Sequence, residues 1–155
     1  MNASMFKLTI NAFADGDTIP RTFTCEGQNI SPALTWTGEP ADTRSFALIM
    51  DDPDAPGGTW NHWLLWDIPQ GTHSLPQAYR ASRPVHSGKN DFGDASYGGP
   101  CPPKGNGPHR YFFRLYALDT PALAVRAGAR RKELERALQP HQLGTGEYVG
   151  RFERR

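Results

Sequence analysis

The segment YGGPCPPKGNGPHRYFFRLYAL, residues 97–118, joins two kinds of sequence. Its first half is rich in glycine and proline, and its second half is an aromatic segment typical of a β-strand. Successive side chains of a strand point to opposite faces, so His109 and Tyr111 are expected to share one face with Phe113 and Leu115. Proline fixes φ and glycine lets the backbone approach a ligand closely. We therefore expect one side of a small, preformed pocket where this strand begins.

The composition predicts one globular domain, residues 1–155, without a field of one charge sign. A chain of 155 residues buries roughly 70% of its extended-chain surface on folding. Lys+Arg 17 against Asp+Glu 16 gives a net charge of +1, so we expect no nucleic-acid partner, and any anion must be recognised locally. The 16 Gly and 14 Pro favour turns over a helical bundle, and 37% hydrophobic residues argue against disorder.

The apolar runs are short and the cysteines are few. No run approaches the ~18 apolar residues of a membrane span, and the first ten residues are too polar for a signal peptide. We expect a cytoplasmic protein without stable membrane insertion. Cys25 and Cys101 then fit free thiols in a reducing compartment, although the sequence leaves open a single bridge between them.

Short apolar runs separated by turn residues predict a mainly β domain. The continuous run at 45–50 predicts a buried central strand that ends in a rigid turn. Further extended segments are expected at 6–10, 21–24, 34–36, 61–68, 111–119 and, as an edge strand, 147–153. Residues 70–96 show no clear periodicity, and 122–138 is the one helical region, giving one or two short helices near the C-terminus. The simplest architecture is a two-sheet sandwich.

An acid and an imidazole flank the turn after the central strand. Asp52 begins the turn and His62 follows it, so local geometry brings the two groups together. Strict alternation would place His62 on one face with Leu64, Trp66 and Ile68. Each residue alone has an ordinary explanation, as a turn aspartate or a strand-end histidine. Two loops rich in proline and glycine, each with a histidine at a strand end, make a shared site more convincing.

Several motifs resemble one known family. DPDAP (52–56), WNHW (60–63) and GPCPPKGNGPHRY (99–111) resemble the signature blocks of the phosphatidylethanolamine-binding proteins, which include the Raf kinase inhibitor proteins. The segments at 25–36, 88–93 and 115–119 resemble the bacterial branch of that family. The resemblance implies an antiparallel two-sheet β-sandwich of Greek-key type with an anion cavity at one end. It also implies a cis peptide at Ala55–Pro56. Motif matching predicts the cavity residues Asp52, His62, Pro103, His109 and Tyr111, with Trp60 at the rim.

The resemblance implies a binding protein for a small anion such as phosphate, phosphorylethanolamine or an acetate-like group, without a cofactor. Imidazoles, a phenol and backbone amides can donate to the anion. Asp52 is expected to orient His62 or to receive the ammonium of ethanolamine. A protein partner, with modulation of kinases or proteases, and a homodimer are further expectations. Asn61, Cys101 within PCPP and the missing long C-terminal helix depart from the animal members, so kinase regulation is not transferred directly.

Two other functions are compatible with the same residues. A Cys101–His109 pair with Asp52 as its orienting group could perform acyl transfer in a hydrolase. His62, His109 and Asp52 also have the composition of a metal site with two histidines and one carboxylate. Against the first, Cys101 lies between two prolines and no helix N-terminus is predicted beside it to form an oxyanion hole. Against the second, the three residues come from strand ends separated by wide loops.

Overall fold

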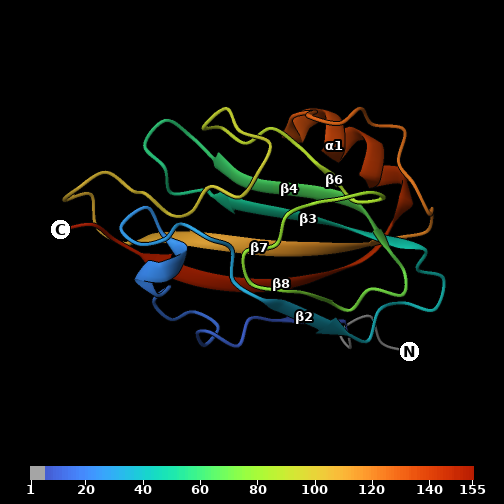
Figure 1. Cartoon of the computed structure of the whole chain (residues 1–155), viewed down its shortest axis with the longest axis horizontal. Helices are drawn as coiled ribbons and strands as arrows, with labels where there is room; N and C mark the ends of the chain where they lie inside the picture. Colours follow the sequence, from blue (N-terminus) through green and yellow to red (C-terminus); the bar gives the residue numbers. More distant parts are fainter. Residues whose placement is uncertain (1–5) are drawn as a thin grey trace.

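The computed structural model describes residues 6–155, which form two antiparallel β-sheets and one short α-helix (Figure 1). The strands are β1 (Lys7–Thr9), β2 (Leu34–Thr37), β3 (Ser45–Asp52), β4 (Trp60–Pro69), β5 (Ser74–Leu75), β6 (His86–Ser87), β7 (His109–Leu118) and β8 (Gln142–Phe152). The helical elements are the 3₁₀ turns η2 (Arg21–Phe23) and η3 (Gln139–His141) and the α-helix α1 (Arg131–Leu138). The expected mainly β, two-sheet fold with a short helix near the C-terminus is confirmed.

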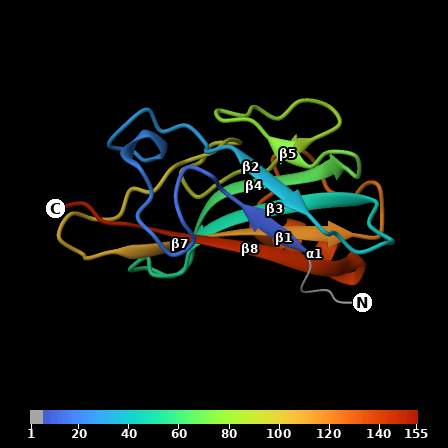
Figure 2. The same cartoon turned by 90° about the horizontal axis from the view of Figure 1, so that it is seen from below.

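The core lies between a small sheet and a large one. The small sheet has the order β1-β2-β5, and the large sheet has the order β6-β4-β3-β7-β8. Figure 2 shows the small sheet crossing over one face of the large one. Every residue of β3 is buried, which confirms the predicted central strand. Apolar side chains from both sheets fill the space between them, including Leu8, Trp36, Phe46 and Phe113.

Helix α1 covers the opposite face of the large sheet. Leu134 and Leu138 are buried there against Ile49 and Trp66, as expected for residues four apart on one face of a helix. The predicted helix at 122–138 is wrong in its first half, because α1 begins only at Arg131. Gly128 has a φ of 80°, and this left-handed conformation interrupts a right-handed helix.

A β-bulge in β4 changes the side-chain pattern expected for 61–68. Asp51 pairs with Asn61 and Met50 pairs with Trp63, so His62 is the extra residue. Leu64 and Trp66 therefore pack under α1, whereas Trp63 lies in the core between the sheets. A second register shift, between the pairs Leu48–Leu65 and Phe46–Ile68, brings Ile68 into the same core. The prediction that His62 shares a face with Leu64 and Trp66 is therefore wrong, because His62 contacts Tyr111, which belongs to the other cluster, as does Ile68.

Three smaller expectations also changed. Residues 21–23 form a 3₁₀ turn in place of an extended segment, closed by a bond from the Phe23 amide to the Pro20 carbonyl. The region 70–96 contains the two-residue strands β5 and β6. Strand β8 begins at Gln142, earlier than the predicted 147, and it lies at the sheet edge as expected.

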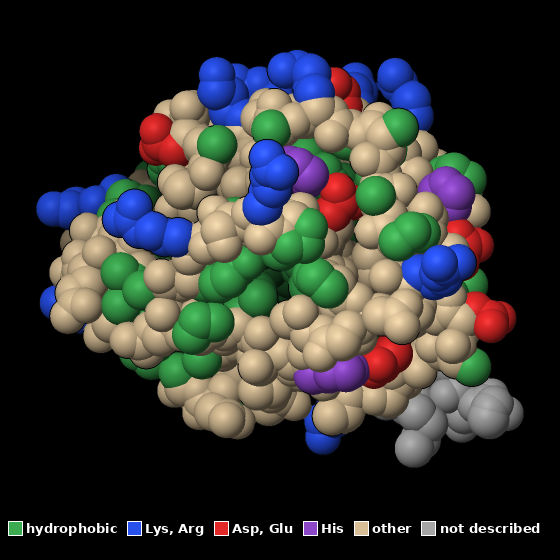
Figure 3. Space-filling model, turned by 45° about the vertical axis from the view of Figure 1, so that its right-hand side comes forward, with side chains coloured by type: hydrophobic (Ala, Val, Ile, Leu, Met, Phe, Trp, Pro, Cys, Tyr) green, Lys and Arg blue, Asp and Glu red, His purple; other side chains and the backbone are tan. Residues whose placement is uncertain are grey.

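Lysine and arginine side chains gather along the upper edge of the face in Figure 3, where α1 lies in Figure 1. Acidic side chains neutralise part of this charge, because Glu133 pairs with Arg126 and Glu135 pairs with Arg131. The surface thus mixes both signs, in agreement with the nearly balanced composition. Among residues 6–155, no helix combines the length and apolar character required to cross a bilayer.

Candidate functional site

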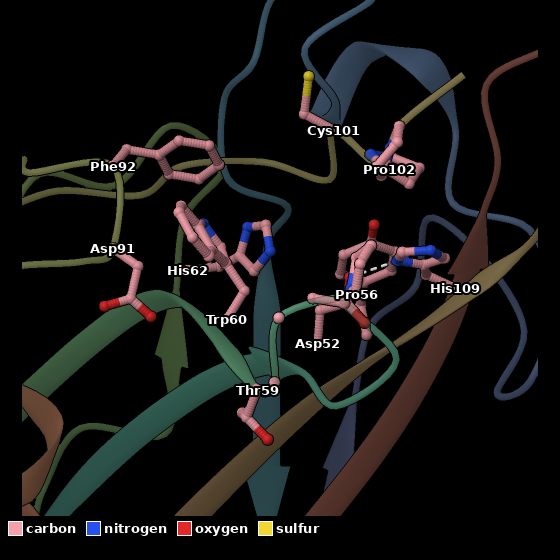
Figure 4. A pocket seen from close by; sticks show the side chains of 15 residues that line it. Asp52, Pro56, Thr59, Trp60, His62, Asp91, Phe92, Cys101, Pro102 and His109 are labelled. Atoms are coloured by element: carbon pink, nitrogen blue, oxygen red, sulfur yellow. Dashed lines mark hydrogen bonds and ion pairs between the residues drawn. The ribbon is translucent and has the colours of Figure 1, made fainter. Parts of the chain in front are cut away.

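The six predicted site residues all line one cavity of about 510 Å³. The cavity lies where the β3–β4 turn and the start of β7 meet two loop segments, 91–92 and 101–103 (Figure 4). The set is Asp52, Trp60, His62, Pro103, His109 and Tyr111. The structure thus gathers them from distant parts of the chain, while their role in binding stays a prediction.

Asp52 and His109 form a buried pair in the cavity wall. His109 Nδ1 lies 2.7 Å from Asp52 Oδ2, and the two side chains are 2% and 4% exposed. The other carboxylate oxygen accepts a bond from the Asp54 amide. The expectation that Asp52 orients His62 is wrong, because its hydrogen-bonded imidazole is that of His109. The β-bulge that displaces His62 gives that ring a different partner.

Arg110, near the start of β7, forms hydrogen bonds that hold the β3–β4 turn in place beside Asp52. Its backbone amide and its guanidinium both donate to Asp54. The hydrogen bonds from Arg110 lower the pKa of Asp54 to about 2, although partial burial opposes the shift. The ion pair is partly exposed, so its main effect is to hold the β3–β4 turn beside His109.

His109 has a second partner that the sequence analysis missed. Its Nε2 lies 2.6 Å from Asn106 Oδ1, so both ring nitrogens face oxygen atoms of the protein. The sequence carried a signal for this contact, because Gly105 and Gly107 flank Asn106 and have φ values of 75° and 81°. Such left-handed positions let a tight loop fold back toward the strand that follows it.

His62 is held through its other side. Its Nδ1 lies 2.6 Å from the Gly98 carbonyl oxygen, and the edge of its ring meets Tyr111 and Phe92 at centroid distances of 5.3 and 5.4 Å. Burial lowers the pKa of His62 below its usual value, although the bond to Gly98 and the charge of Asp52 oppose the shift. The ring is therefore mainly neutral at neutral pH.

Among residues 6–155 the buried Tyr111 hydroxyl forms no hydrogen bond within the usual distance and angle limits, although the Asp52 carboxylate lies near enough to act on it. Burial raises the pKa of this phenol, and the nearby charge of Asp52 acts in the same direction. The hydroxyl thus keeps its proton at any physiological pH. An unpaired buried donor costs free energy, and Tyr111 is among the residues that line the cavity.

Two aromatic rings form an exposed rim. Trp60 and Phe92 are 38% and 45% exposed, and their centroids lie 5.6 Å apart in an edge-to-face arrangement. Figure 4 shows both beside His62 at one side of the cavity. Trp60 was expected at the rim, whereas Phe92 was missed even though its segment GKNDFG was recognised as a motif.

The expectation of free thiols is wrong, because Cys25 and Cys101 form a disulfide. The two cysteines are 76 residues apart in the chain, and the Cys25 amide bonds to the Pro100 carbonyl at 3.1 Å. Cys101 lines the cavity. The bridge therefore ties the proline wall to the loop after η2, and the cysteines no longer support a reducing compartment.

The predicted cis peptide is wrong as well. Ala55–Pro56 is trans, and the cis peptide within residues 6–155 lies at Arg83–Pro84. The β3–β4 turn is closed instead by hydrogen bonds from the Asp54 amide to Asp52 and from the Gly58 amide to the Ala55 carbonyl. These bonds are compatible with a trans chain at Pro56.

The family model described as phosphatidylethanolamine-binding protein matches residues 9–153. The chain belongs to the phosphatidylethanolamine-binding protein family. Among its relatives in this family, the UPF0098 protein of Methanothermobacter thermautotrophicus is 45% identical over 151 residues, which cover 95% of this chain and 98% of the relative. The UPF0098 protein PH1269 of Pyrococcus horikoshii is also 45% identical over 150 residues, covering 94% of this chain and 75% of the relative.

Solved structures in the family have the same architecture. The crystal structure of YbcL from Escherichia coli, described as a new member of the mammalian family, matches with a TM-score of 0.92 and 35% identity, covering 97% of this chain and 99% of that chain. A homologue from Chlamydia trachomatis matches with a TM-score of 0.88 and 34% identity, covering 97% and 98%. These matches confirm the resemblance inferred from the sequence motifs.

Proposed function

We propose that the cavity binds a small phosphate-like anion, either phosphate itself or the phosphoryl group of phosphorylethanolamine. The hydroxyl of Tyr111 supports this proposal most strongly, because it is a buried donor that lines a cavity of suitable size and forms no hydrogen bond of normal geometry within residues 6–155. A charged acceptor would form a stronger hydrogen bond with this donor than a neutral one. Membership of the phosphatidylethanolamine-binding family supports the same ligand chemistry.

The Asp52–His109 pair supports anion binding indirectly. Both oxygens of Asp52 accept hydrogen bonds from the protein, and these bonds reduce the repulsion that a bare carboxylate would exert on an anion. The same bonds leave Asp52 less able to receive an ethanolamine ammonium. The phosphoryl end of the ligand is therefore the end that the cavity is proposed to recognise.

Calorimetry with phosphate and phosphorylethanolamine tests the proposal. The variant Tyr111→Phe keeps the ring and removes the hydroxyl, so binding is expected to weaken about tenfold. His109→Ala is expected to weaken binding by disturbing the wall. Tyr116→Phe is a matched control, since Tyr116 lies away from the cavity. Equal binding by wild type and Tyr111→Phe, or no binding of either anion, would contradict the proposal.

The binding role is preferred over the two alternatives. The hydrolase required a thiolate at Cys101, and that sulfur is in a disulfide. This closes the Cys101–His109 route, while the absence of any enzymatic activity stays a prediction. For the metal site, no group of three or more histidine, cysteine, aspartate or glutamate side chains suited to a metal occurs within residues 6–155.

A protein partner is a second proposal, supported by the exposed aromatic rim of Trp60 and Phe92. Aromatic side chains are enriched at protein interfaces. A carboxypeptidase Y inhibitor, seen in complex with its cognate proteinase, shares only the fold, with a TM-score of 0.59 and 18% identity. Kinase or protease modulation and a homodimer therefore stay predictions, which pull-downs with and without excess phosphate and measurement of the solution mass would test.

Cytoplasmic location also stays a prediction. A relative from Mycobacterium tuberculosis, 41% identical over 141 residues that cover 91% of this chain, carries the name lipoprotein LppC. The Cys25–Cys101 bridge is more typical of oxidising compartments. Fractionation of cells that produce the protein, with thiol labelling of each fraction, tests this prediction.

A further inference from the structure

His62 presents one particular nitrogen to the cavity. The Gly98 carbonyl can only accept a hydrogen bond, so the ring nitrogen 2.6 Å away, Nδ1, must carry the proton. Among the side-chain hydrogen bonds of residues 6–155, His62 uses Nδ1, and none involves the other nitrogen, Nε2. In Figure 4 the ring lies between Phe92 and the Asp52–His109 pair, at the centre of the cavity. The unpartnered Nε2 is therefore available to a ligand.

The form of the ring decides what Nε2 can do. A neutral imidazole with its proton on Nδ1 offers a lone pair on Nε2, which accepts a hydrogen bond and cannot donate one. Burial favours this neutral form of His62. The cavity thus combines one acceptor, His62 Nε2, with one donor, the Tyr111 hydroxyl.

The charged groups nearest to these two atoms already have partners, because Asp52 and His109 bond to each other. Neither lysine nor arginine is among the described residues that line the cavity. Asp91, at the rim, accepts two hydrogen bonds from Asn61 and lies 3.7 Å from Arg130. A fully deprotonated anion has no proton to donate, so it could not form a hydrogen bond with the lone pair of His62 Nε2. An anion that keeps one proton could donate to His62 and accept from Tyr111.

We propose that the pocket selects oxyanions that carry a proton, with His62 Nε2 accepting that proton's hydrogen bond and Tyr111 donating to another oxygen of the same group. This selection rests on the proposed anion-binding function. The favoured ligands are hydrogenphosphate and the singly protonated form of phosphate monoesters. Sulfate and phosphate diesters have no such proton, and the diesters include the head group of an intact phospholipid.

The pH dependence follows from the groups that surround His62. These are Asp51 and Asp52 on β3, Asp91 on the loop, and His109 and Tyr111 on β7. When acid protonates His62, Nε2 becomes a donor and can bond to sulfate. Sulfate binding is therefore expected to strengthen as pH falls, and the preference for phosphate is expected to shrink.

Calorimetry of wild-type protein with phosphate and sulfate at about pH 8 tests the selection, because hydrogenphosphate and sulfate then share charge and shape and differ in the proton. Phosphate is expected to bind at least about tenfold more tightly. At about pH 6, phosphorylethanolamine, a monoester that can keep a proton, is expected to bind more tightly than the diester glycerophosphoethanolamine by a similar factor. Equal or tighter binding of sulfate would overturn the selection alone. Failure of both anions to bind would overturn the anion-binding function as well.

Two variants of His62 separate this role from a structural one. His62→Asn can keep an amide donor toward Gly98 and removes the Nε2 position, so it is expected to lose the phosphate preference. His62→Gln can place an amide donor at the Nε2 position, so it is expected to favour sulfate. Thermal midpoints identify variants that fail to fold. An unchanged phosphate preference in both folded variants would overturn the assignment to His62; should neither fold, equal phosphate and sulfate binding by wild type still overturns the proposal.

Discussion

The pocket contains two histidines that are equally buried and chemically different. His109 and His62 are each 2% exposed, yet His109 has oxygen partners at both ring nitrogens, Asp52 and Asn106. Within the described part of the chain, residues 6–155, His62 has a hydrogen-bond partner at Nδ1 alone, the Gly98 carbonyl. The difference shows that burial alone does not define a functional histidine. The β7 side of the pocket is held at both ring nitrogens, and the β4 side has a ring nitrogen that we propose as a ligand contact.

One segment supplies partners to both rings. Gly98 contacts His62, Asn106 contacts His109, and Cys101 lies between them in the chain. The disulfide to Cys25 therefore anchors the segment on which the difference between the two histidines depends. The predictions below begin with the loss of this anchor and proceed to smaller changes.

Removal of the disulfide is expected to have the largest effect. The double variant Cys25→Ser, Cys101→Ser should lose about 4 kcal/mol of unfolding free energy, because the bridge closes a long loop in the unfolded chain. Phosphate binding should weaken at the same time, since both histidine partners lose their anchor. Urea unfolding and calorimetry measure the two effects. Treatment of wild type with a dithiol should reproduce the result and leave the double variant unchanged, whereas full stability after complete reduction would contradict the prediction.

Asp52→Ala is expected to break the fixed side of the pocket alone. It removes one partner of a buried pair and leaves the His109 ring without its acceptor, which should cost about 3 kcal/mol of unfolding free energy. Urea unfolding measures the cost, and Asp42→Ala serves as the control because Asp42 is exposed. A loss no greater than that of the control would show that the Asp52–His109 pair does not stabilise the wall.

A smaller effect is expected from pH, and it concerns His62. The folded-state pKa of this ring lies below the usual 6.5. As pH falls through 6.5, the unfolded chain therefore takes up this proton before the folded protein does. Stability is then expected to be complete above about pH 7 and to decline below it, by at most about 1.4 kcal/mol per pH unit for one group. His62→Gln should lack this component. The prediction would be contradicted if the unfolding free energies of wild type and His62→Gln changed with pH in the same way across this range.

The sequence predicted the fold and the membership of the pocket well, because both depend on local patterns. The apolar run at 45–50 marked the central strand, and the proline and glycine segments marked the wall. Alternation along 109–115 correctly placed His109 and Tyr111 on the buried face of β7. These features are encoded by the residues that form them.

The partners of the site residues could not be predicted in the same way. His62 is the extra residue of a β-bulge, and Asp52 bonds His109 in its place. The disulfide joins loops 76 residues apart, and its formation depends on how those loops lie against each other. The Asn106 contact depends on two left-handed glycines, whose conformations the composition permits without requiring them. Long-range pairing therefore required the coordinates.

The protonation of the His62 ring tests the central claim most directly. Long-range nitrogen–proton NMR on protein with labelled histidines distinguishes the two ring nitrogens, and His62→Asn assigns the signals. At neutral pH without added anion, we expect His62 to carry its proton on Nδ1 and to have an unprotonated Nε2, with a change in the Nε2 signal when phosphate is added. A proton on Nε2 under these conditions, or no response of that nitrogen to saturating phosphate, would contradict the proposed recognition.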